Sequence, residues 1–283
     1  MNQQASASAP ATTANIGPGF DIIALALGLR CRVTAVLADE WSVRHVNDLR
    51  PDADEGDGVL VAARHAVGER PLELSVETEI PIGRGLGSSA ASYVAGVAAA
   101  LRAVGEEANP DRVFRLAADL EGHDDQVGAA VYGGLVVVPA EGLPIRLPFH
   151  PSLRVVIAIP DTKLPTAKAR AVIPAQHPHD VVLRSLSRVS TLTAGLITGD
   201  PEMLAASHGD EIHEVHRANL SPEVDMMKDV ARRAGAHHAA RSGAGPSIVA
   251  ITSIDQADRV AAALAETGAA VINQPMDPTG LAW

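Results

Sequence analysis

A glycine- and serine-rich segment, Pro81-Ile-Gly-Arg-Gly-Leu-Gly-Ser-Ser-Ala-Ala91, is the part of the sequence best suited to chemistry. Its three glycines at alternate positions let the backbone approach a ligand closely and adopt conformations closed to other residues. Successive N–H groups in such a loop bind anions, and the start of a following helix adds partial positive charge. Ser88 and Ser89 add hydroxyls for a phosphate oxygen or a metal. A purely structural turn or cap is the alternative, and the two serines favour the phosphate site.

Two other loops carry polar groups that could hold a small substrate. In Pro10–Asp21, Asn15 and Asp21 offer an amide and a carboxylate for an ammonium or hydroxyl group, although a plain turn would use such residues for its backbone geometry. Glu121-Gly-His-Asp-Asp-Gln126 sets a carboxylate beside a histidine, which suits a metal or acid–base site; a solvated acidic loop is the alternative. Oxygen ligands of this kind fit Mg²⁺, whereas the histidines lack a recognised zinc spacing.

The remaining candidates are a basic loop and a second small-residue loop. Asp161–Arg170 holds Lys163, Lys168 and Arg170 in a chain that has only three lysines, so it is a local positive cluster. Such a cluster suits a carboxylate or a phosphate, and a simple exposed loop is the alternative. Ser242-Gly-Ala-Gly-Pro-Ser247 could let its backbone approach the phosphate loop, although many turns look alike.

Composition limits the classes of partner and compartment. The chain has 283 residues, 47% hydrophobic and 20% charged, which supports a sizeable core and excludes wholesale disorder. Its formal net charge of −11 disfavours nucleic acid and anionic membranes as partners. The single cysteine, Cys31, excludes an internal disulfide and multi-cysteine zinc sites. With no leader pattern in residues 1–9 and no apolar run near the roughly 20 residues that a bilayer requires, a cytoplasmic location is expected.

The pattern of apolar residues predicts the elements that position these loops. Four prolines between Pro139 and Pro151 mark a boundary, giving predicted domains 1–150 and 151–283. In the first we expect strands at 22–29, 72–80 and 133–138, helices from 88 onward and at 111–121, and an acidic loop at 47–58. In the second we expect strands at 153–159, 248–251 and 269–273 and helices at 181–196, 201–216 and 256–267. This alternation predicts a small α/β sandwich.

Together the motifs resemble those of the GHMP small-molecule kinases. Pro81–Ala91 is similar to the ATP-phosphate loop of that superfamily, and the 242–247 segment to its C-terminal glycine motif. Three further segments resemble the members that phosphorylate L-homoserine: 10–21, Glu121-Gly-His-x-Asp125 with Gly133-Gly134, and Thr166 to Arg170 before Ile173-Pro174. The resemblance implies an α+β, two-domain GHMP kinase fold. Its N-terminal domain would be like domain 2 of ribosomal protein S5, and its C-terminal domain would be a ferredoxin-like α/β sandwich.

The resemblance also implies a reaction, a metal ion and the residues that bind each substrate. The reaction would be ATP-dependent phosphorylation of the side-chain hydroxyl of L-homoserine, in threonine biosynthesis, with Mg²⁺ held by Ser89 (or Ser88) and Glu121. The expected catalytic residues are Glu121, Ser89 and Arg170. The expected ATP-binding residues are Pro81, Ile82, Gly83, Arg84, Gly85, Leu86, Gly87, Ser88, Ser89, Ala90, Ala91, Gly243 and Gly245. The expected substrate-binding residues are Asn15, Asp21, His123, Gln126, Arg170 and Arg217. A homodimer is also implied, with no nucleic-acid or membrane partner.

The sequence departs from the family pattern in the loop after residue 121. Asp124 and Gln126 stand where the family has proline and asparagine, and the longer glutamine reaches one methylene further. No asparagine matches the one common near the adenine site around residues 57–60. Another GHMP kinase with a different small alcohol as substrate, or a non-catalytic ligand sensor on the same fold, are therefore the alternatives. A serine hydrolase is disfavoured because the sequence has no Gly-x-Ser-x-Gly elbow.

Overall fold

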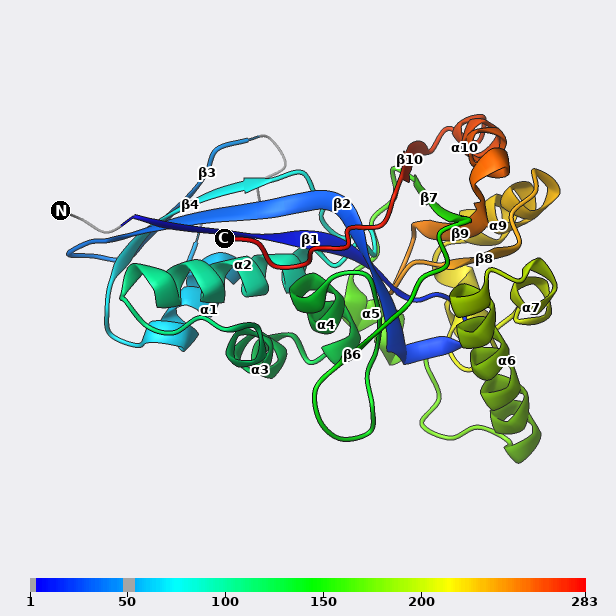
Figure 1. Ribbon diagram of the computed structural model, residues 1–283, viewed down its shortest axis with the longest axis horizontal. Coiled ribbons are helices and arrows are strands. Elements are labelled where there is room, and N and C mark those ends of the chain that lie inside the picture. The colour runs from blue at the N-terminus through cyan, green and yellow to red at the C-terminus, as the bar shows by residue number, and fades with distance from the viewer. Residues whose placement is uncertain (1–3, 48–53) are drawn as a thin grey trace.

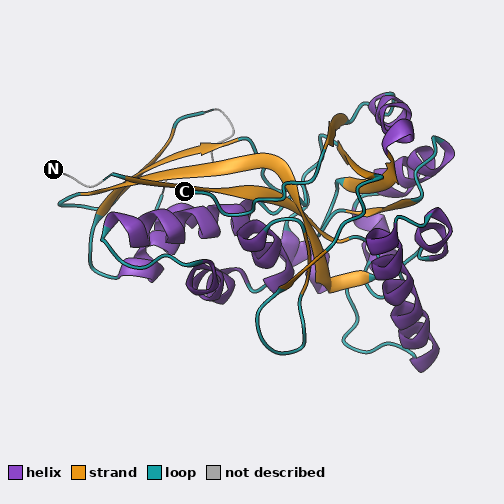
Figure 2. Ribbon diagram, viewed as in Figure 1, coloured by secondary structure: helices purple, strands orange, loops and turns teal. Residues whose placement is uncertain are grey.

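The computed structural model describes residues 4–47 and 54–283 and has two lobes (Figure 1). The first lobe contains a mixed sheet of six described strands in the order β3-β4-β2-β5-β6, with β1 paired to β2. Its strands are β1 (Ala5–Asn15), β2 (Gly19–Leu37), β3 (Ser42–His45), β4 (Leu72–Thr78), β5 (Leu135–Val137) and β6 (Ile145–Leu147). Helices α1 (Gly58–Val67), α2 (Ser88–Ala103), α3 (Pro110–Glu121) and α4 (Asp124–Tyr132) lie on one side of the sheet (Figure 2).

The core of this lobe is built from small side chains, as the 2% aromatic content requires. Helix α2 is buried over most of its length because its alanines let it pack closely on both β1 and α1. A Cβ at Gly96 would come within 3.1 Å of the Val59 carbonyl oxygen, so the two helices are nearly in backbone contact. This packing fixes the direction of α2, and with it the helix start that follows the glycine loop.

The second lobe is an antiparallel sheet of four described strands in the order β10-β7-β9-β8. Its strands are β7 (Leu153–Ile159), β8 (His238–Arg241), β9 (Ile248–Ser253) and β10 (Ala270–Gln274). Its helices are α5 (Thr166–Ala171), α6 (His179–Thr198), α7 (Pro201–Ala206), α8 (Glu214–Arg217), α9 (Glu223–Arg233) and α10 (Ala257–Ala265). A β-α-β-β-α-β chain order with the last strand beside the first is the ferredoxin-like arrangement. The predicted fold class is therefore confirmed.

The end of the chain returns from the second lobe to the first (Figure 1). After β10, Ser8 and Ala282 exchange backbone hydrogen bonds, and the Asp277 carboxylate pairs with Arg30 of β2. The two sheets divide between β6 and β7, near the predicted boundary after residue 150, which stays a prediction. Among the described residues, no helix combines the length and the hydropathy needed to cross a bilayer.

One local expectation is wrong, and several elements were not expected. The single helix expected over 201–216 is wrong: α7 and α8 are separate, because Asp210 accepts hydrogen bonds from the amides of His213 and Glu214 and starts a new turn. The loop expected over 47–58 ends where α1 begins at Gly58, and residues 48–53 lie outside the described part. Strands β1, β3, β6 and β8 and helices α1, α4, α5 and α9 were not predicted from the sequence.

Candidate active site

The glycine-rich loop leads directly into α2 and lines a pocket of about 290 Å³. Gly83, Gly85 and Gly87 have φ angles of 70°, 73° and 65°, in the left-handed region that favours glycine. No side chain caps the first turn of α2. The first backbone N–H groups of a helix have no partner within it, so an anion placed here would accept from them and lie at the positive end of the helix dipole.

The segment 242–247 of the second lobe packs against this loop. Ser242 Oγ donates to the carbonyl oxygen of Gly85 at 2.6 Å. A Cβ at Gly85 would overlap the carbonyl oxygen of Ser242 and come within 2.8 Å of the Gly245 nitrogen. Gly243 and Gly245 do not line the pocket, whereas Ala244 between them does. The 242–247 segment therefore packs against the glycine-rich loop, the approach that its sequence allowed.

Most of the residues expected to bind ATP line this pocket. They are Pro81, Ile82, Gly83, Gly85, Leu86, Gly87, Ser88 and Ser89. Arg84 instead donates to the carbonyl oxygen of Pro160, and Ala90 and Ala91 are buried within α2. Tyr93, on the next turn of α2, is an aromatic side chain in the pocket wall that sequence reasoning did not single out.

The same pocket contains oxygen donors suited to a divalent cation. The Glu121 carboxylate and the Ser88 and Ser89 hydroxyls all line it. Among the described residues there is no group of three or more acidic, histidine or cysteine side chains able to hold a metal. Mg²⁺ commonly keeps water and substrate phosphate oxygens and takes only one or two protein ligands, so this donor set fits it.

A second polar cluster connects to Glu121 through a chain of hydrogen bonds. His123 Nδ1 lies 3.3 Å from Glu121 Oε1, and its Nε2 accepts from Arg170 Nε at 2.9 Å. Arg170 Nη2 in turn donates to Asp21 Oδ1 at 2.7 Å. The Asp21 amide donates to Asn15 Oδ1 at 3.0 Å. The structure thus brings these five predicted residues, from three separate segments, into one site.

Arg217, the residue with the weakest sequence match, lies beside the same Phe20 ring as Arg170. Its guanidinium carbon and that of Arg170 each lie 5.5 Å from the centre of the Phe20 ring. Arg217 is 2% exposed, and burial, followed by the charges of Arg241 and Arg170, lowers its pKa to about 10. Phe20 was not predicted as a site residue, because an aromatic between Gly19 and Asp21 looks like the start of a strand.

Asp125 lies in the Glu121–Gln126 segment, and sequence reasoning gave it no role of its own. It is 1% exposed, and one carboxylate oxygen accepts from the Gln126 amide at 2.8 Å, whereas the other has no partner among the described residues. Burial, and next the charge of Asp21, raise the pKa of Asp125 to about 7. Gln126 lines the same pocket as the glycine-rich loop, with Oε1 3.5 Å from Thr12 Oγ1.

Comparisons with known proteins agree with the fold and the motifs. Residues 57–134 match the model for the GHMP kinases N terminal domain, and residues 195–270 match that for GHMP kinases C terminal. A homoserine kinase from Gloeobacter violaceus is 36% identical over 96% of both chains. The chain therefore belongs to the GHMP kinase family.

Within that family, relatives at 34–38% identity are named homoserine kinase. A homoserine kinase from Thermus thermophilus is 38% identical over 86% of this chain and 85% of its own. The crystal structure of homoserine kinase from Cytophaga hutchinsonii superimposes with a TM-score of 0.88, at 30% identity, over 100% of this chain and 98% of the other. The predicted resemblance is thus confirmed, down to the homoserine kinase branch of the family.

Proposed function

We propose that this protein transfers the γ-phosphoryl group of ATP to the side-chain hydroxyl of L-homoserine and so forms O-phospho-L-homoserine, a step of threonine biosynthesis. The observation that carries the proposal is the chain of contacts Glu121–His123–Arg170–Asp21. This chain connects the pocket beside the glycine-rich loop to the Asp21–Arg170 ion pair. A phosphoryl acceptor that is also a zwitterion would lie across that junction.

The residues of the cluster suit the two charges of an amino acid. Arg170 and Arg217 present guanidinium groups, which bind carboxylates with two parallel hydrogen bonds. Asp21 and Asp125 present carboxylates for the ammonium group, and Asn15 fixes the Asp21 backbone. With both charged ends held, the side-chain hydroxyl lies toward Gln126 and the phosphate loop.

Catalysis would rest on alignment and charge neutralisation. Phosphoryl transfer needs in-line positioning and stabilisation of equatorial oxygen charge more than covalent help from the protein. The α2 amides and dipole would stabilise that charge. Mg²⁺, held by Glu121 and by Ser89 or Ser88, would supply further neutralisation of the phosphate charge when bound with ATP. We assign no residue as a strong base for the hydroxyl proton.

A substrate panel tests this proposal. ADP release is measured with L-homoserine, mevalonate, galactose and no acceptor, and the product is identified by ³¹P NMR. We expect turnover only with L-homoserine. Turnover with L-homoserine no faster than the blank would contradict the proposal, and nucleotide binding without turnover on any acceptor would favour a ligand sensor.

Gln126 supports a second candidate, a GHMP kinase for another small amino alcohol. The glutamine amide lies in the pocket wall where a shorter side chain would leave more space. L-Serine and L-homoserine should therefore be compared by kcat/KM in the same panel. The cytoplasmic location and the homodimer stay predictions.

A further inference from the structure

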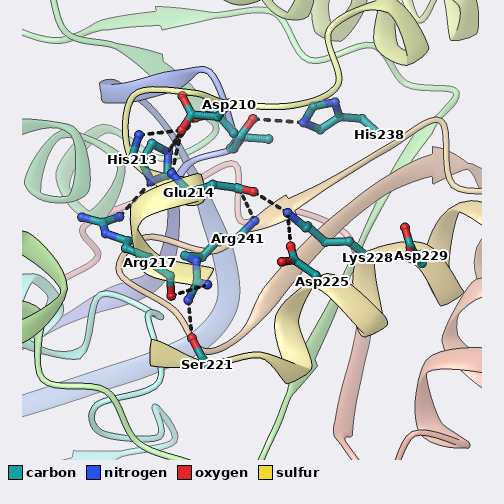
Figure 3. Close-up of polar contacts among 12 residues, drawn as sticks. Asp210, His213, Glu214, Arg217, Ser221, Asp225, Lys228, Asp229, His238 and Arg241 are labelled. Atoms are coloured by element: carbon teal, nitrogen blue, oxygen red, sulfur yellow. Dashed lines mark hydrogen bonds and ion pairs between the residues drawn. The ribbon is translucent and has the colours of Figure 1, made fainter. Parts of the chain in front are cut away.

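A buried polar cluster around His213 includes Arg217 of the proposed homoserine site (Figure 3). At its centre His213 is fully buried, with 0% exposure. Arg217 Nη1 lies 2.9 Å from His213 Nδ1, and the carbonyl oxygen of Gly17 lies 2.9 Å from His213 Nε2. Gly17 belongs to the same turn as Asn15 and Asp21. His213 thus connects the turn that carries the proposed ammonium-binding group to the guanidinium of Arg217.

These two contacts permit one protonation state of the imidazole. A carbonyl oxygen only accepts, so His213 Nε2 must donate its proton to Gly17. A guanidinium only donates, so His213 Nδ1 must accept from Arg217. A neutral ring protonated at Nε2 satisfies both contacts, whereas an imidazolium would direct an N–H at Arg217. Burial lowers the pKa of His213, which agrees with a neutral ring.

The surroundings hold the ring in place. Phe20 stacks on it with a centroid distance of 4.8 Å and an interplanar angle of 20°. Asp210 Oδ2 accepts from the His213 amide at 2.7 Å and lies 3.6 Å from its Nε2. The neighbouring Glu214 carboxylate does not reach the ring, because it accepts from Lys228 Nζ and from the Arg241 amide, each at 2.6 Å.

Arg217 depends on acceptors at its inner side. Its Nε donates to the Ala169 carbonyl oxygen at 3.0 Å, and Nη1 is shared between His213 and the Gly243 carbonyl oxygen at 3.2 Å. Within the described residues, Nη2 makes no hydrogen bond and is left for a ligand. His213 is the one side-chain acceptor recorded for this guanidinium in that part of the chain.

We propose that His213 is a positioning residue that acts through Arg217: by accepting from Nη1 in its neutral, Nε2-protonated form, it turns the free edge of the guanidinium toward the carboxylate of the bound amino acid. The inference rests on the proposed function, since it takes Arg217 to bind substrate. No proton moves to or from His213 during the reaction.

Two substitutions at His213 separate the two contacts. His213→Asn keeps an acceptor close to the Nδ1 position, whereas His213→Gln keeps a donor close to Nε2 and loses the acceptor. We expect H213Q to raise the KM for L-homoserine about 10-fold or more, the scale of a lost charged hydrogen bond. We expect kcat and the KM for ATP to change less than about twofold. H213N should stay within about threefold of the unchanged protein for all three parameters, and the exposed His179→Gln is the control.

The action through Arg217 is tested by a double-mutant cycle. In an Arg217→Ala background, H213Q should add no further increase in the KM for L-homoserine. Equal effects of H213N and H213Q, or additive effects in the cycle, would overturn the proposal. If a variant does not fold, ¹⁵N-histidine NMR of the unchanged protein provides the test. In that spectrum His213 should be protonated at Nε2 alone at neutral pH. An Nδ1-protonated or charged ring would also overturn it. That measurement needs no turnover, so its result is independent of the substrate panel.

Discussion

At the residue scale, the Asp21–Arg170 ion pair has a property that matters for substrate binding. Each side chain is 40% exposed. Ion pairs with this much solvent access contribute only about 0–1 kcal/mol. A zwitterion can therefore insert its carboxylate at Arg170 and its ammonium at Asp21, and each charge exchanges one partner for another.

This exchange of partners predicts how substitutions at Arg170 change the KM for L-homoserine. Arg170→Ala should raise the KM for L-homoserine roughly 10- to 100-fold, since a hydrogen bond to a charged group contributes about 1.5–3 kcal/mol. The KM for ATP should change little. Arg170→Lys keeps the charge but loses the fork geometry, so it should recover only part of the loss. Steady-state kinetics in both substrates decide it; an equal rise in both KM values would remove Arg170 from the carboxylate site.

A substitution of Glu121 should change the Mg²⁺ dependence of turnover more than the KM for L-homoserine, because we assign Glu121 to the metal and not to the amino acid. Glu121→Gln should raise the Mg²⁺ concentration needed for half-maximal turnover several-fold and lower kcat, with a smaller effect on the KM for L-homoserine. The contact to His123 at 3.3 Å is long, so losing it should matter less. Turnover titrated with MgCl₂ at saturating ATP is the measurement. An unchanged Mg²⁺ dependence would contradict the assignment.

Histidine 123 adds a pH dependence with a definite sign. Its hydrogen bond to Glu121 is the first cause that raises its pKa. Nε2 accepts from Arg170 only while the ring is neutral. As the pH falls through this raised pKa, the ring becomes charged and repels Arg170, so the KM for L-homoserine should rise toward acid pH. A KM profile between pH 5 and 8 measures this, and His123→Asn should flatten it.

The sequence revealed those site residues whose function requires a special residue type. The alternating glycines were visible because Gly83, Gly85 and Gly87 need positive φ angles. Asp125 lay within the Glu121-Gly-His-x-Asp motif but was given no role, because its pKa depends on burial, and a run of acidic residues looks solvated until the fold covers it. Phe20 was missed for a similar reason: its contacts with Arg170 and Arg217 form only when distant segments meet.

At the element scale, the glycine loop and the 242–247 segment form one packed unit from two lobes. This predicts that Gly85→Ala raises the KM for ATP at least 10-fold, because the added Cβ overlaps the Ser242 carbonyl oxygen and displaces the loop. Gly105→Ala is the matched control: its φ of 76° carries the same penalty of about 1–2 kcal/mol, with nothing within 4 Å. Thermal unfolding separates the two costs. Equal KM values for ATP in both variants would contradict the close packing.

The elements predicted best were those with a clear apolar period. The expected strand at 72–80 appears as β4, and the helix at 181–196 appears as α6. The helix expected over 201–216 is wrong because the Asp210 carboxylate accepts from the amides of His213 and Glu214 and starts a separate turn, which the apolar spacing does not reveal. Strand β1 was missed because alanine, serine and threonine dominate it, and its burial depends on α2 packing against it.

At the scale of the whole molecule, the buried carboxylate of Asp125 lowers the stability of the folded protein, although we propose that it binds the substrate's ammonium group. Its pKa of about 7 lies above the ordinary aspartate value of 3.8, so the folded state binds this proton more tightly than the unfolded state does. The penalty is absent below about pH 4, grows between pH 4 and 7, and is complete above pH 7. One pKa unit is about 1.4 kcal/mol, so it reaches roughly 4 kcal/mol. Active-site groups often carry such a cost.

Asp125→Asn should therefore stabilise the protein while it weakens function. We expect the Tm of D125N to exceed that of the unchanged protein by several degrees at pH 8, and the difference to shrink steadily as the pH falls from 7 to 4. The KM for L-homoserine should rise, because one ammonium-binding carboxylate is gone. Asp124→Asn, one residue earlier and exposed, controls for the loss of charge at the start of α4. Calorimetry across pH measures the difference. A Tm gain that does not depend on pH, or one matched by D124N, would mean that Asp125 is not the buried ionised group inferred from its contacts.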